Sequence, residues 1–122
     1  MGQKMNTSCD DQIKYIIQTR KNISSKTLTS TRLIILTLLY NYDKIGIQYR
    51  ELKQALGLSD GNLYSNLSNL IEMGFIQETE IVLDNRTMKI YNLTKKGKSN
   101  LRKIMEWVCA IKNLLNNGDE EC

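Results

Sequence analysis

The chain has 122 residues, of which 41% are hydrophobic and 25% charged, and its formal net charge is +4. This length and composition suit one globular domain, with or without helical extensions. There is no histidine, and the three cysteines, Cys9, Cys109 and Cys122, form no C-x-x-C pair. We therefore exclude a zinc site of the usual kinds and any nucleophile activated by histidine, and we expect no metal and no cofactor.

The distribution of charge and of apolar residues bears on the partner and the location. Three of the 13 acidic residues occupy positions 119–121, so the rest of the chain is more basic than the total indicates. A basic surface suits a polyanionic partner, although a lysine-rich proteome gives the same balance. Apolar runs such as residues 33–36 are far too short to cross a bilayer, and the N-terminus shows no signal peptide. We expect no membrane association, reduced thiols and a cytoplasmic location.

Two helices are predicted in the first third of the chain. Isoleucines at helical spacing predict a short amphipathic helix over about 10–22. A hydroxyl-rich connector follows, in which Thr29 or Ser30 can cap the next helix. That helix, about 31–42, is apolar almost all round and should be the central buried one. Only a very short strand fits at 45–47.

A second pair of helices follows with a tight turn between them. The first spans about 48–56 and ends at Gly57, which suits the left-handed C′ position of a helix. Ser59 then caps the helix 59–73, which we call the reader helix. Its apolar stripe consists of Leu63, Leu67 and Leu70 at spacings of four and three.

The remainder predicts a β-hairpin and a long helix. Two β-rich runs, 75–83 and 88–93, are joined by a loop over 84–87. Thr94 then caps a final helix over about 95–116. A helix pair followed by a hairpin is typical of a helix-turn-helix unit with a wing. We predict a mainly α (α+β) fold, with an N-terminal helix and connector (1–29), a winged helix-turn-helix domain (30–94), and a C-terminal dimerisation helix with an acidic tail (95–122).

The outer face of the reader helix is unusual in composition. It carries small polar side chains (Gly61, Asn62, Ser65, Ser68 and Asn69). Most exposed helix faces carry Lys and Glu, because Asn and Ser lower helix propensity. Amide and hydroxyl groups can, however, bond to base edges in a DNA major groove. The alternatives are an ordinary amphipathic helix and asparagine enrichment from an AT-rich genome, and both stay open.

Three segments in order resemble the winged helix-turn-helix transcription regulators of bacteria and archaea, with the arsenic-repressor and multiple-antibiotic-resistance-repressor types nearest. The segments are Glu51-Leu52-x-x-Ala55-Leu56-Gly57-Leu58-Ser59, Leu63-x-x-x-Leu67-x-x-Leu70-x-x-x-Gly74-Phe75-Ile76 and Tyr91-x-Leu93-Thr94-x-x-Gly97-x-x-x-Leu101. Each pattern alone is loose, but the three at these spacings are specific and cover roughly 31–101.

The resemblance implies that the reader helix enters the major groove and that the wing, 84–89, lies on the minor groove or the backbone. The base-reading residues would be Asn62, Tyr64, Ser65, Asn66 and Asn69. The backbone and wing contacts would be Arg32, Arg50, Asn85, Arg86, Lys89 and Lys95. Tyr64 could instead pack beside the core, and Arg86 could be an ordinary hairpin charge. The reader helix contains neither Arg nor Lys, and asparagine suits adenine, so we expect an AT-rich inverted repeat in double-stranded DNA.

The final helix carries an apolar seam at spacings of three and four, which is typical of helix–helix association. A single wing domain has little surface to cover so broad a stripe, so we expect a homodimer. The alternative is that the first helix covers the stripe within a monomer. The expected interface residues are Ile13, Ile17, Leu101, Ile104, Val108, Ile111 and Leu115. We interpret Cys109 as a small packing residue.

The most consistent interpretation is a sequence-specific DNA-binding protein, a dimeric transcription regulator. We expect no enzymatic activity, because the sequence offers no acid pair, nucleophile–base pair or phosphate loop. A plasmid or viral partition or replication protein has the same architecture, and so does a winged helix that binds only proteins. The sequence identifies neither an operator nor a small-molecule effector.

Overall fold

The computed structural model describes residues 7–116, with side chains from Asp10 onward. The chain divides into two compact units. One, the central unit, is Ser25–Leu101, and the other, the terminal unit, combines the described parts of the two ends, 7–24 and 102–116. No helix in the described part of the chain is long and apolar enough to cross a membrane.

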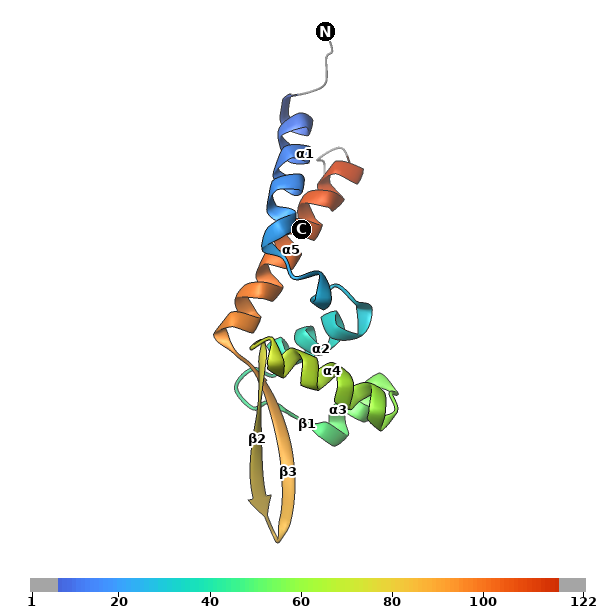
Figure 1. Ribbon diagram of the computed structural model, residues 1–122, viewed down its shortest axis with the longest axis vertical. Helices are drawn as coiled ribbons and strands as arrows, with labels where there is room; N and C mark the ends of the chain where they lie inside the picture. The colour runs from blue at the N-terminus through green and yellow to red at the C-terminus, as the bar shows by residue number, and fades with distance from the viewer. Residues whose placement is uncertain (1–6, 117–122) are drawn as a thin grey trace. The chain divides into compact units, whose positions relative to one another are not determined.

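The elements follow the predicted order, as Figure 1 shows. The helices are α1 (Thr7–Thr19), η1 (Arg20–Asn22), η2 (Ser25–Thr27), α2 (Ser30–Asn41), α3 (Tyr49–Leu56), α4 (Asp60–Glu72) and α5 (Lys95–Leu115). The strands are β1 (Ile47–Gln48), β2 (Ile76–Leu83) and β3 (Arg86–Leu93), in the sheet order β1-β3-β2. The mainly helical fold with a small antiparallel sheet and a long final helix is confirmed. The predicted first helix ends as α-helix at Thr19 and continues as the 3-10 turn η1.

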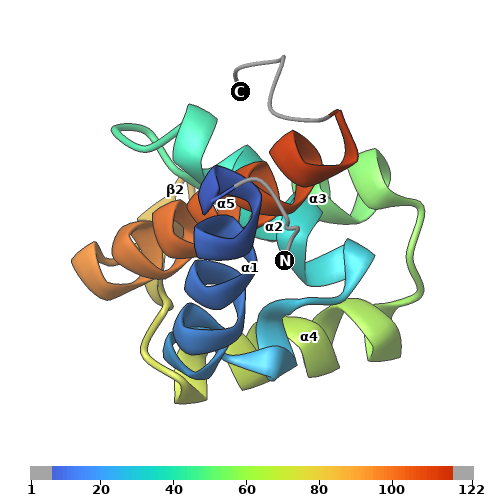
Figure 2. The same cartoon turned by 90° about the horizontal axis from the view of Figure 1, so that it is seen from above.

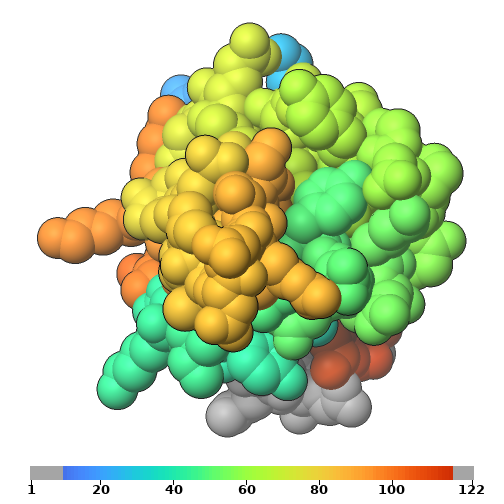
Figure 3. Space-filling view, turned by 90° about the horizontal axis from the view of Figure 1, so that it is seen from below, coloured from blue at the N-terminus to red at the C-terminus, as the bar shows by residue number. Residues whose placement is uncertain are grey.

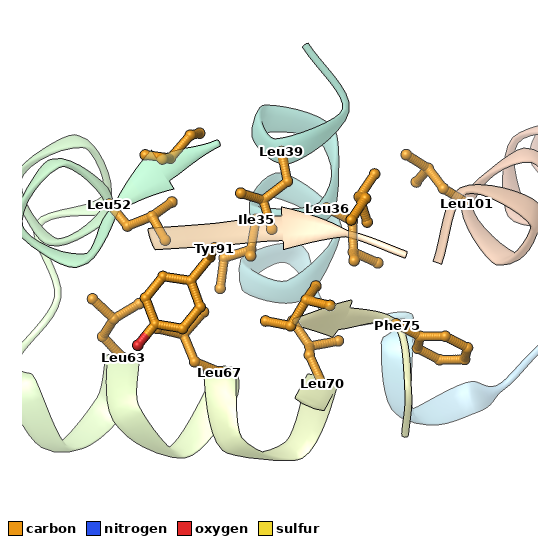
Figure 4. Close-up of a cluster of buried hydrophobic side chains, with 13 residues drawn as sticks. Ile35, Leu36, Leu39, Leu52, Leu63, Leu67, Leu70, Phe75, Tyr91 and Leu101 are labelled. Carbon is orange, nitrogen blue, oxygen red and sulfur yellow. The ribbon is translucent and has the colours of Figure 1, made fainter. Parts of the chain in front are cut away.

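The core of the central unit lies between α2, α3, α4 and the roots of the strands (Figure 4). The stripe Leu63, Leu67 and Leu70 of α4 is fully or almost fully buried, as its spacing predicts. Leu101, at the end of this unit, belongs to the same core cluster. The helix α2, expected to be the central buried one, buries Ile35, Leu36 and Leu39 completely, but its Ile34 is 48% exposed.

Local signals at the helix ends account for the helix-turn-helix geometry. Thr29 caps α2 by accepting a hydrogen bond from the backbone N–H of Arg32 at 3.2 Å. Gly57 has φ 64° and ends α3 in the left-handed region, as predicted. The Ser59 hydroxyl accepts from the N–H of Asn62 at 3.2 Å and caps α4. The turn between α3 and α4 is therefore encoded locally.

The wing differs in detail from the prediction. Leu83 pairs with Arg86, so the loop is the dipeptide Asp84-Asn85 and not 84–87. Both turn residues have positive φ, 50° and 63°. Two successive positive φ values are the mark of a type I′ turn, whose twist matches that of the strands, and Asp and Asn tolerate them. As a result, β3 begins at Arg86, and the hairpin projects from the helices of its unit (Figure 1).

The root of the wing is joined tightly to the start of α5. The Thr94 hydroxyl donates to the carbonyl oxygen of Gly74 at 2.6 Å and accepts from the N–H of Gly97 at 2.9 Å. A Cβ added at Gly97 would lie 2.0 Å from the carbonyl oxygen of Phe75, so only glycine fits there. These contacts fix where the wing leaves the core.

In the terminal unit, α1 runs beside the C-terminal part of α5, as Figures 1 and 2 both show. Trp107 donates from its indole N–H to the carbonyl oxygen of Ile16 at 2.9 Å. Cys109 is disulfide-bonded. The expectation of reduced thiols and a free packing cysteine was therefore wrong.

The predicted interface residues differ widely in exposure. Leu101 is 7% exposed and Ile104 is completely buried, so the subunit itself uses both. Ile13 and Ile111 are half-buried. Ile17, Val108 and Leu115 are 66%, 41% and 78% exposed, so the chain leaves part of the apolar seam uncovered.

Candidate nucleic-acid interface

The exposed face of α4 presents the predicted reading residues unequally. Asn62, Tyr64 and Ser65 are exposed, whereas Asn66 and Asn69 are half-buried. The side chain of Tyr64 is 65% exposed, so it does not pack into the core. The free polar surface of this helix is thus concentrated in its first half.

The N-terminus of α4 is anchored to α3 through Asp60. Lys53 Nζ lies 3.1 Å from Asp60 Oδ2, and the Tyr49 hydroxyl donates to Asp60 Oδ1 at 3.0 Å. The hydrogen bonds from Lys53 and then Tyr49 lower the pKa of the Asp60 carboxyl. Burial and then the nearby carboxylate raise the pKa of Tyr49. The anchor also pairs the one negative charge in the first turn of α4 with a lysine.

A second polar contact holds the middle of α4. Arg32, which the sequence placed on the DNA backbone, donates from Nε to Asn66 Oδ1 at 2.9 Å. Its Nη1 donates to the carbonyl oxygen of Lys26 at 2.7 Å. Asn66 Nδ2 in turn donates to Asn62 Oδ1 at 2.7 Å and to the carbonyl oxygen of Asn62 at 2.9 Å. Arg32 is therefore joined to the reading face by side chains of the protein.

Asn69 is also engaged within its own helix. Its Nδ2 donates to the carbonyl oxygen of Ser65, one turn earlier, at 2.9 Å. Such a bond to the i−4 carbonyl competes with contacts outside the helix. Of the three asparagines, Asn62 is the one whose amide nitrogen has no partner among the described residues.

A groove of about 680 Å³ separates the wing from α3 and α4. Figure 3 shows the wing, in gold and orange, beside the green surface of these helices. The residues that line the groove are Gln48, Tyr49, Arg50, Tyr64, Arg86, Thr87, Met88, Lys89 and Tyr91. Three cationic side chains and three tyrosines therefore face one concave surface, which gives it both charge and hydrogen-bonding groups.

Two contacts order the inner end of this groove. The Tyr91 hydroxyl donates to Glu78 Oε2 at 2.6 Å, and the two residues are direct partners across β2 and β3. Burial, followed by the bond to Glu78, raises the pKa of Tyr91, which stays protonated as a donor. Lys89 Nζ lies 4.0 Å from Glu78 Oε1, a long and exposed ion pair that leaves its charge available.

Comparison with known families decides the identity of this architecture. Residues 31–112 match a family model described as a winged helix DNA-binding domain. The chain belongs to this family. The match confirms the winged helix-turn-helix architecture expected from the sequence, and it spans both the reader helix and the wing.

Similar proteins come from archaea and bacteria. The uncharacterized protein MJ0432 of Methanocaldococcus jannaschii is 39% identical over 67 residues, which cover 55% of this chain and 71% of that protein. A transcriptional regulator homologue from Pyrococcus horikoshii OT3 has a TM-score of 0.65 at 19% identity, covering 90% of this chain and 99% of the other. A mutant of S. aureus MepR bound to an oligodeoxyribonucleotide has a TM-score of 0.65 at 17% identity, covering 97% and 87%. The two structures show a shared fold.

The residues that were predicted to contact the DNA backbone lie in separate places on this winged helix. Arg50, Arg86 and Lys89 line the groove. Asn85 lies in the turn at the wing tip, and Lys95 is exposed at the start of α5. Arg32 is occupied by Asn66 and Lys26. The structure thus brings three of the six residues predicted to contact the DNA backbone or form the wing to one surface.

Sequence analysis missed several residues of the site. Tyr49 and Tyr91 line the groove, and Lys53 and Tyr49 anchor Asp60. Neither tyrosine was among the predicted site residues. The one sequence signal for the anchor is the combination of a lysine near the end of α3 with an aspartate just after the turn. No group of His, Cys, Asp and Glu within the described residues could hold a metal ion.

Proposed function

We propose that this winged helix protein is a transcription regulator that binds an AT-rich inverted repeat in double-stranded DNA as a homodimer. The reader helix of each subunit would enter a major groove, and the wing would lie on the adjacent minor groove or backbone. With two-fold symmetry, the two reader helices would be about one DNA turn apart, roughly 34–36 Å.

One observation carries this proposal. Tyr64, which is exposed on α4 together with Asn62 and Ser65, lines the same groove as Arg50, Arg86 and Lys89. Hydrogen-bonding side chains without charge suit base edges, whereas guanidinium and ammonium groups suit phosphates. A DNA duplex needs both kinds of contact side by side.

The relatives support the regulatory role. The structure from Pyrococcus horikoshii OT3 is titled as a transcriptional regulator homologue, and the MepR mutant is bound to an oligodeoxyribonucleotide. These titles describe other proteins, and their fold is what this chain shares. Regulation remains our inference for this chain.

The exposed apolar side chains of the terminal unit support a second copy as the partner. Ile17 on α1 and Met105, Val108 and Leu115 on α5 are 66%, 46%, 41% and 78% exposed. An apolar face of this kind on a helix pair is typical of an association surface. Leu101 and Ile104 are left out of the proposed interface because they are buried in the subunit.

DNA binding should be measured on random duplex and by random-site selection. If each subunit neutralises about four phosphates, the slope of log K against log salt should be about −7. A slope shallower than about −2 would show that the basic groove is not the binding surface. The selection should enrich an AT-rich inverted repeat, and a GC-rich motif would contradict the proposed reading. A footprint on DNA beside its own gene would support regulation, whereas long arrays of sites would support partition.

A further inference from the structure

Arg32 contacts Asn66 of the reader helix, 34 positions later in the chain, and Asn66 in turn contacts the exposed Asn62. Arg32 lies near the start of α2 and is half-buried. Its guanidinium has two fixed acceptors, the Asn66 side chain and the carbonyl oxygen of Lys26 in η2. Two of its five N–H donors are therefore already used inside the free protein.

Asn66 transmits this contact. Its Oδ1 accepts from Arg32, so its Nδ2 must be the donor, and both bonds from Nδ2 go to Asn62. A donor chain that starts at a cation strengthens each following bond, because every amide in it is polarised in the same sense. Both printed bonds of the Asn66 Nδ2 group, and one lone pair of its Oδ1, are then used within the protein, so Asn66 keeps no free N–H donor for a base.

The series of hydrogen bonds from Arg32 through Asn66 determines which group of the Asn62 amide is free to contact a base. One lone pair of Asn62 Oδ1 is taken by Asn66, which fixes the carbonyl end of the amide toward the protein. The Nδ2 end, with two N–H donors, is left for an acceptor outside the protein. Adenine N7 is such an acceptor in the major groove, and the second lone pair of Oδ1 can accept from adenine N6.

We infer that Arg32 is a specificity-determining positioning residue, which holds Asn62 in its base-reading orientation through Asn66. This inference rests on the proposed function, and it moves Arg32 from the DNA backbone and Asn66 from the base-reading set. Side chains that are locked before binding lose less conformational entropy on binding, so the benefit appears as discrimination between bases.

The decisive variant is Arg32→Lys, which keeps the charge but loses the planar fork that reaches two acceptors at once. Random-site selection should show weaker preference, by about 2- to 10-fold, at the base position that Asn62→Ala also affects. Affinity for random duplex and the salt slope should stay as in the wild type. Adding Asn62→Ala to Arg32→Lys should cause no further loss than Asn62→Ala alone, because both act on one contact.

Lys26→Gln is the matched control. It removes a positive charge beside Arg32 but keeps the backbone carbonyl that accepts from Arg32, so the selected motif should not change. Asn66→Ala removes the middle residue of this series of hydrogen bonds and should weaken the preference at the same base position. If melting curves show that Arg32→Lys does not fold, Asn66→Ala tests the same inference in its place.

NMR of the free protein tests the contact without DNA. The Arg32 Nε–H and the Asn66 side-chain amide protons should exchange slowly in the wild type, and the Asn66 protons should exchange faster in Arg32→Lys. If the wild type enriches a motif and Arg32→Lys enriches it with equal stringency, the inference is wrong while the proposed function stands. Arg32→Gln, which removes the charge, should keep the wild-type salt slope; a lower slope in this variant would mean a phosphate contact and would also overturn the inference. If the wild type enriches no motif, the proposed function fails and this inference fails with it.

Discussion

The reader helix and the wing side of the groove differ in charge. Between Ser59 and Gly74 the chain has no Arg or Lys, and the exposed face of α4 offers amide and hydroxyl groups. Across the groove, the wing contributes Arg86 and Lys89. Charge attracts any DNA sequence, whereas oriented neutral donors discriminate between bases. Under the proposed function, this difference assigns affinity to the wing side and discrimination to α4.

The two regions also differ in how they are held. Asp60 and Asn66 fix α4 at its first turn and at its middle, through side chains of α3 and α2. The wing is fixed at its root by Thr94 and Gly97, and its outer half is exposed. A base-reading element needs exact placement, but a phosphate-binding element tolerates movement, because charge acts over several ångströms.

The largest expected effect comes from dimerisation, which would present two copies of the reader helix and two wings to one DNA duplex. Val108→Asp combined with Leu115→Asp places charges on exposed apolar positions of α5, so each subunit should still fold. Sedimentation should show a monomer, and affinity for an inverted repeat should fall by roughly 100-fold or more. Ile45→Asp, at an apolar side chain that is 79% exposed elsewhere, is the control and should remain dimeric. A wild type that sediments as a monomer at micromolar concentration would refute the dimer.

The next effect separates discrimination from affinity. Asn62→Ala should cost about 1–3 kcal/mol of discrimination at one base position of each half-site, and leave binding to random duplex nearly unchanged. Random-site selection together with titration of random duplex measures both quantities. Gln54→Ala, an exposed amide on α3, should change neither. Selection of the wild-type motif by Asn62→Ala, with equal stringency, would show that α4 does not read bases through this residue.

A smaller and uniform effect is expected on the wing. Arg86→Ala should weaken all duplexes alike, by about tenfold per wing near 0.1 M salt, and should reduce the salt slope by roughly one unit per wing. Lys21→Ala removes an equal charge from the exposed η1 and should leave the slope unchanged. If Arg86→Ala changes the selected motif but not the slope, then the wing takes part in discrimination and α4 is not the only base-reading element.

Local patterns predicted most of the fold, and they failed where distant residues meet. Gly57 and Ser59 encode the turn within a few residues, so its position could be read from the sequence. The contact of Arg32 with Asn66 could not, because no periodicity links residues 34 positions apart. Leu101 was assigned to a dimer interface because core and interface residues share one helical spacing, and only tertiary structure separates them.

The smallest effect tests how α4 is anchored. Lys53 and Tyr49 stabilise the charged form of Asp60, so the pKa of this carboxyl lies below its ordinary value of 3.8 in the folded protein. The unfolded chain therefore takes up this proton more readily than the folded protein. The stabilisation is fully present above the ordinary pKa and is lost as the pH falls through the folded pKa.

An NMR titration of the Asp60 carboxyl should show this lowered pKa, and in Lys53→Gln the value should return toward the ordinary one. Melting temperatures at pH 5 and pH 3 should then differ slightly less in Asp60→Asn than in the wild type. The difference is small because Asp60 is fully exposed and water screens its contacts. If Lys53→Gln left the pKa of Asp60 unchanged, the ion pair would not hold the first turn of α4. The contact at Asn66 would then be the main constraint on the reading face.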